Sequence, residues 1–135
     1  MVRNLPEITQ MHERLQAHAA ALFRALDDAD GDVARRALAA FIAAVDEHVR
    51  ADIALGYRLL LRHPSDAVRR VAEHVLRDQE AFPRTFESFV AAWRDVSRDE
   101  ILHAPFRDDV ETLVSDLLKR IRVEGRLVAM LSSVA

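Results

Sequence analysis

The chain has 135 residues and a mass of 15.3 kDa, and half of its residues are apolar, which is enough for one domain with a buried core. Only 3 glycines and 4 prolines are present, a composition that excludes collagen-like and turn-rich all-β chains. A net charge of −3 argues against nucleic-acid binding. The absence of cysteine excludes disulfides, cysteine-ligated zinc and iron–sulfur clusters.

The sequence also argues against a membrane or secreted protein. No apolar run approaches the roughly 20 residues of a membrane span. Residues 1–13 lack the apolar core of a signal peptide. We therefore expect a soluble, cytoplasmic protein that does not bind membranes.

Apolar residues recur every three or four positions through most of the chain, which predicts long amphipathic helices. The predicted helices span about residues 6–28, 32–62, 64–93 and 105–131. Pro83 lies inside the third helix, and we expect it to kink that helix or restart it. In the longer connection before the last helix, the stretch Ser97–Glu100 predicts a short helical turn.

The connections set the expected topology. The turn at 27–31 and the turn at 63–66 are short, so each joins two helices that lie side by side and run in opposite directions. The sequence therefore predicts an all-α fold, an up-down-up-down four-helix bundle formed by a single domain over residues 1–135.

Each predicted helix carries at least one histidine or carboxylate in register with its apolar residues. Buried carboxylates are costly unless they are paired or bound to a metal ion, so these positions are informative. In the third helix either His74 or Val75 continues the apolar register. The candidate ligands are His12, His48, Asp52, His74, Asp78 and Glu124.

These residues are expected at one level of the bundle. His12 lies 18 residues before Asp30 in the first turn, and His48 lies 18 residues after it. The pairs on the second and third helices lie at matching distances from the turn between them, and Glu124 lies 9 residues before the expected helix end near Ser133. At a rise of about 1.5 Å per residue, all the candidate ligands fall within a layer one to two turns thick.

Imidazoles and carboxylates together suit iron, manganese or zinc. The His-x-x-x-Asp spacing of His48–Asp52 and His74–Asp78 places two ligands on one helix face, one turn apart. Six ligands are enough for two metal ions with bridging carboxylates.

Arg120 leaves an alternative open, because it lies one turn before Glu124. It could close a metal-free hydrogen-bonded network or take the place of one metal ion.

At these residues the chain resembles the hemerythrin-like family of HHE cation-binding domains, over nearly its whole length. Residues 48–55 resemble the His-x-x-x-Glu of the family's second helix, with Asp52 in place of glutamate. Residues 78–93 resemble its third helix, in which an acid or histidine precedes spaced aromatic residues. Residues 120–124 resemble the Arg-Ile-x-x-Glu of its fourth helix, and His12 stands at the position of the first-helix histidine.

The resemblance implies a non-haem di-iron centre in a four-helix bundle. Members of the family carry, sense or reduce O₂ or its relatives, or take part in iron and redox responses. Oxygen-carrying members use five histidines and two carboxylates, whereas only three histidines lie on the predicted seams here. Asp78 stands where a second third-helix histidine is common, and Arg120 stands where a fourth-helix histidine would be. Reversible O₂ carriage is therefore not expected.

Two functions from different classes follow. The first is a metal-binding protein, with iron expected and manganese or zinc as alternatives. Its expected small-molecule partner is O₂ or a small oxidant, and it is expected to be a monomer or homodimer. The second is a degenerate, metal-free bundle that acts as a protein-interaction or regulatory module. A third hypothesis is that the chain is a di-metal oxidase or peroxidase. The chain contains no phosphate-binding loop, dinucleotide fingerprint or acyl-transfer constellation, so a binding role is favoured over catalysis.

Overall fold

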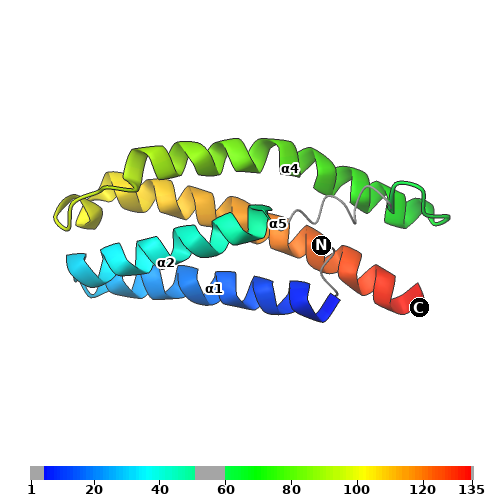
Figure 1. Cartoon of the computed structure of the whole chain (residues 1–135), viewed down its shortest axis with the longest axis horizontal. Helices are drawn as coiled ribbons and strands as arrows, with labels where there is room; N and C mark the ends of the chain where they lie inside the picture. The colour runs from blue at the N-terminus through cyan, green and yellow to red at the C-terminus, as the bar shows by residue number, and fades with distance from the viewer. Residues whose placement is uncertain (1–4, 51–59, 135) are drawn as a thin grey trace.

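The computed structural model describes residues 5–50 and 60–134, with their side chains except at positions 5–7, 78–80, 127–128 and 130–134. These residues are all-helical, without a strand. The elements are α1 (Leu5–Asp27), α2 (Gly31–Arg50), α4 (Asp66–Trp93), the short 3-10 helix η1 (Glu100–Leu102) and α5 (Ala104–Val134). They form a helical bundle in which α1 packs along α2 and α4 packs along α5, while α5 also contacts α1 (Figure 1).

The predicted helices agree closely with the observed ones. The predicted end of the second helix falls close to the structure's turn at residues 61–62, and residues 51–59 lie outside the described part of the chain. Helix α4 begins two residues after the predicted start because Ser65 caps it, its side chain accepting a hydrogen bond from the backbone of Val68 (3.4 Å). The predicted turn in the longer connection is also present, since Ser97 Oγ accepts from Glu100 N (3.0 Å) at the start of η1.

Of the two outcomes expected at Pro83, a kink or a restart of the helix, the restart does not occur. Pro83 lies inside α4, which continues from Asp66 to Trp93 as one arched helix (Figure 1). A proline in a helix interior costs about 3 kcal/mol because it removes one hydrogen bond and crowds the preceding turn. Buried phenylalanines on both sides of it, Phe82 and Phe86, anchor the helix in the core and offset that cost.

The helices are amphipathic, and none of those described is both long and apolar enough to cross a membrane. Their apolar faces meet in one large cluster, to which all the long helices and the segment before α5 contribute. Its largest fully buried side chains are Leu15, Leu22, Phe41, Ile101, Phe106, Leu113 and Leu117. Each such side chain contributes roughly 1.5–3 kcal/mol on burial, so this cluster holds the bundle together.

The turn between α1 and α2 ends one helix and begins the next within three residues. The backbone N–H of Asp30 donates to Ala25 O (3.2 Å). The N–H of Ala29 donates to Leu26 O (3.1 Å), which completes a Schellman motif. Ala29 therefore has a left-handed backbone, with φ of 54°. Asp30 then caps α2, because its Oδ1 accepts from Val33 N (3.1 Å).

The beginning of α2 packs against the segment that leads into α5. A Cβ atom on Gly31 would overlap the backbone carbonyl of Arg98, so glycine permits this close approach. The same segment buries Ile101 completely, and η1 contacts both α2 and α5. This contact closes the end of the bundle that lies opposite the polar residues described below.

Substitutions at Ala29 and Gly31, on the two sides of this turn, should change the free energy of unfolding in opposite directions. Ala29→Gly relieves a left-handed alanine and should raise the free energy of unfolding by about 1 kcal/mol, net of the extra entropy of the unfolded chain. Gly31→Ala forces a methyl group into the Arg98 carbonyl and should lower it by roughly 1–3 kcal/mol. Urea denaturation of both variants checks the signs, and equal effects would contradict the turn geometry.

Candidate metal centre

A small group of polar side chains is buried beside the large apolar cluster. It draws on α1, α2 and α5, and its members are the buried polar or charged residues among the side chains that the structure describes. They are His12, His48, Arg120 and Glu124. His12, His48 and Glu124 were predicted ligands, and Arg120 was the predicted neutralising group. Along α5, Ile121 belongs to the large cluster and Val123 packs on a smaller one around Val68 and Val75, so the group lies where the two clusters meet.

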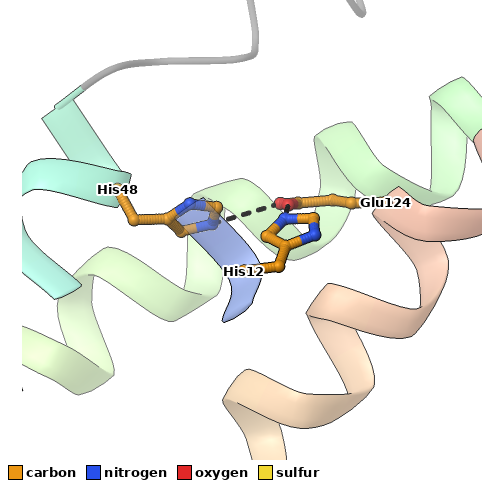
Figure 2. Close-up of side chains that lie close together, drawn as sticks. All are labelled: His12, His48 and Glu124. Atoms are coloured by element: carbon orange, nitrogen blue, oxygen red, sulfur yellow. Dashed lines mark hydrogen bonds and ion pairs between the residues drawn. The ribbon is translucent and has the colours of Figure 1, made fainter. Parts of the chain in front are cut away.

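The carboxylate of Glu124 is the centre of the group. Its side chain is 0% exposed, and it points toward two imidazoles that come from different helices (Figure 2). His12 Nε2 lies 2.6 Å from Glu124 Oε2, a short hydrogen bond in which the ring N–H donates to the carboxylate. His48 Nε2 lies 3.4 Å from Glu124 Oε1. The two imidazole rings are 5.5 Å apart between centroids and meet edge to face.

His48 is held in a defined orientation by a neighbour that does not belong to the predicted site. Its Nδ1 lies 2.9 Å from the thioether sulfur of Met11, which accepts hydrogen bonds and donates none. The Nδ1 atom therefore carries the hydrogen in this contact, and a neutral His48 has its lone pair on Nε2. That Nε2 atom is buried and has no hydrogen-bond partner among the atoms that the structure describes, although it faces a carboxylate oxygen.

Arg120 reaches the same carboxylate from its own helix, one turn earlier. Its Nε donates to Glu124 Oε1 at 3.1 Å. The guanidinium carbon lies 5.2 Å from the centre of the Phe82 ring, a cation–π contact that fixes the other side of the group. The Nη1 atom of Arg120 is buried without an acceptor among the described atoms.

These neighbours keep Glu124 ionised. Burial alone opposes ionisation, because a charged carboxylate loses its hydration. The imidazoles of His12 and His48 and the guanidinium of Arg120 outweigh that effect and hold the pKa of Glu124 well below its usual range. The core of the bundle therefore contains a fixed negative charge that requires a cation beside it.

This arrangement can hold a metal ion. One ligand atom from each of His12, His48 and Glu124 lies within 4.8 Å of the others, and all three residues are buried. Metal–ligand bonds of about 2.0–2.2 Å place ligand atoms no more than about 4.4 Å apart, so modest side-chain rotations would complete the geometry. Two imidazoles and one carboxylate are the donor set of many mononuclear iron and zinc sites, which keep other positions open.

Of the three remaining predicted ligands, the structure describes the side chain of His74 alone. His74 lies on α4 with an exposed side chain, contrary to the expectation that it could face the core. The buried stripe there runs through Val68, Ala72 and Val75, so Val75 is the residue in register. Asp52 lies outside the described residues, and Asp78 lies in α4 at a position whose side chain is not described. Their predicted role as ligands remains a prediction.

Sequence reasoning did not identify two contributors to the group. Met11 is buried and sets the orientation of His48, but an apolar residue next to a seam predicts only core packing. Phe82 is one of the spaced aromatic residues of the third predicted helix, and its contact with a buried cation is an added role. Met11 lies three residues after Ile8 and four before Leu15, and this spacing could have placed it on the buried face of its helix. Its polar contact could not be predicted in this way, because the partner lies on another helix.

Comparison with protein-family models, with curated proteins and with solved structures finds no match to this chain. The geometry of the buried group therefore carries the functional argument.

The buried pair of Arg120 and Glu124 predicts strong energetic coupling. In metal-free protein, Glu124→Gln leaves an unpaired guanidinium in the core, and Arg120→Met leaves the carboxylate with only its imidazole partners. Each variant should lose about 3–5 kcal/mol of unfolding free energy, because removal of one partner strands the other charge. The double variant should lose less than the sum of the two losses by about 2 kcal/mol. Urea unfolding with a chelator present measures this cycle, and additive losses would contradict the pairing.

Proposed function

We propose that this chain is a hemerythrin-like metal-binding protein with an up-down-up-down four-helix topology. In this proposal His12, His48 and Glu124 hold non-haem iron, and the protein serves in the sensing or handling of oxygen, redox state or iron. Support comes from the residues and motifs of the resemblance and from the buried group at the predicted level of the bundle. Bound iron would supply a redox-active centre with coordination positions open to a small molecule.

One observation carries the proposal. When His48 is neutral, its Nε2 lone pair faces Glu124 Oε1 across 3.4 Å and has no hydrogen-bond partner among the described atoms, while Oε1 accepts a hydrogen bond from Arg120 Nε alone. Two acceptors in this position repel each other in a core that water does not screen. A cation bound to both atoms converts that repulsion into two coordination bonds.

The chain's own residues would prepare the site for a metal ion. Met11 holds the ring of His48 through Nδ1, which keeps the lone pair on the nitrogen that faces Glu124. The surrounding apolar clusters exclude water and thereby strengthen the attraction between the carboxylate and a cation. The hydrogen on His12 Nε2 must leave that nitrogen when it binds a metal ion, either to Nδ1 of the same ring or to solvent.

Metal binding by wild type and two variants tests this proposal. The purified full chain is dialysed anaerobically against Fe(II), and in parallel against Mn(II) and Zn(II), and bound metal is measured by elemental analysis. We expect wild-type protein to retain metal. His48→Leu should bind metal about 10- to 100-fold more weakly, because a ligand is lost. His18→Leu on α1 is the matched control and should bind as wild type does. Retention of less than about a tenth of an equivalent of every metal by wild type would refute the proposal.

A metal-free interaction module is the second candidate. Arg120 already supplies a cation to Glu124, so the buried group has a balanced charge without a metal ion. A groove of about 1300 Å³ lies between α2 and α4, with apolar residues of both helices in its walls. These walls include Leu38, Ile42, Phe86 and Val90. This face favours contact with a partner protein.

Thermal unfolding separates the two candidates. A ligand that binds only the folded state stabilises it by mass action, so Fe(II) or Zn(II) at about 100 times its dissociation constant should add about 2.7 kcal/mol. We expect the melting temperature of wild type to rise with metal and to return to its starting value with chelator. The same melting temperature in both conditions would support the metal-free module. His18→Leu again serves as the control.

A further inference from the structure

The chemistry around Glu124 also bears on how many cations the centre takes. A carboxylate that bridges two metal ions directs one oxygen at each ion. Here Oε2 faces His12, while Oε1 is shared between His48 and the guanidinium of Arg120. One of the two oxygens that a bridging carboxylate needs, Oε1, is therefore already bound to a cation of the chain itself.

Arg120 is built into this position. It is 6% exposed, and Glu124 lies one turn away on the same face of α5, so the backbone itself brings the two side chains together. On its other side the guanidinium lies against the ring of Phe82 from α4. An arginine stays charged at any pH that the folded protein tolerates. It thus contributes a permanent positive charge, because metal binding cannot neutralise an arginine by displacing a proton from it.

The charge balance of the described group points the same way. Glu124 contributes one negative charge and Arg120 one positive charge, and histidine ligands bind metal in their neutral form. One divalent cation brings the described group to +2, which ligands from solvent can offset. A second divalent cation would bring it to +4 within the same buried volume, where repulsion between like charges is strong.

We infer that the centre holds one divalent cation per chain, on His12, His48 and Glu124, and that Arg120 takes the place of a second one. This inference rests on the proposed metal-binding function and deepens it. It departs from the two-metal site that six ligands would allow, and it gives the buried arginine a role that packing alone does not explain. It also predicts that Arg120 competes electrostatically with the bound cation.

The stoichiometry of Co(II) binding tests the inference. The full chain is titrated with Co(II) by calorimetry, and bound cobalt is confirmed by elemental analysis after desalting. The ligand-field absorption of the cobalt gives a third readout that does not depend on activity. We expect saturation at one equivalent per chain. Two equivalents would overturn this inference and leave the proposed function standing, whereas no binding of Co(II) or of the other metals would overturn both.

Removal of the competing charge gives a second test. Arg120→Met should bind Co(II) more tightly than wild type, by roughly tenfold or more, because the cation no longer shares Glu124 with a guanidinium. Arg122→Met, an exposed arginine two residues away on the same helix, removes the same charge outside the core and should leave the dissociation constant unchanged. Arg120→Gln keeps a hydrogen-bond donor and serves if the methionine variant does not fold. Weaker binding by the Arg120 variants than by wild type would make Arg120 a positioning residue and overturn the inference.

Discussion

The ionised carboxylate of Glu124 is the constraint on which the centre of this bundle depends. A charge without water around it must be met by positive or donating groups, and the chain supplies them from three directions. Arg120 comes from the same helix, and His12 and His48 come from the α1–α2 hairpin. The carboxylate therefore ties α5 to that hairpin at a defined height. Apolar packing alone fixes such a position weakly, because it tolerates sliding of one helix along another.

The level of this group could be predicted because long helices are regular. A fixed rise per residue and short turns convert sequence distance from a turn into height, and polar residues within an apolar stripe must then face each other. His12, His48 and Glu124 meet as expected for that reason. The helix boundaries were also predictable to within a few residues, because the turns at 27–31 and 63–66 are encoded locally, although the cap at Ser65 sets the start of α4 two residues after the predicted one.

The rest of the site could not be predicted, since it depends on rotation and on contacts between helices. Neighbouring residues in a helix point about 100° apart, so the sequence left His74 and Val75 as equal choices, and the structure buries Val75. Pro83 carries a strong local signal for a break, yet packing by Phe82 and Phe86 overrides it. The contact between Met11 and His48 joins residues 37 positions apart, and no local pattern reports it.

Whether the buried group is completed by a metal ion depends on a difference between two arrangements of similar charge. Without a metal, Arg120 neutralises Glu124, but among the described residues the Nε2 of a neutral His48 lacks a partner and Arg120 Nη1 lacks an acceptor. With a metal ion bound, His48 and Glu124 coordinate the same cation, and the guanidinium of Arg120 then lies close to a second positive charge. The first arrangement leaves polar atoms unsatisfied, and the second adds repulsion. Because Arg120 lessens the penalty of the metal-free form, it should make metal binding more readily reversible than it would be on a lone buried carboxylate.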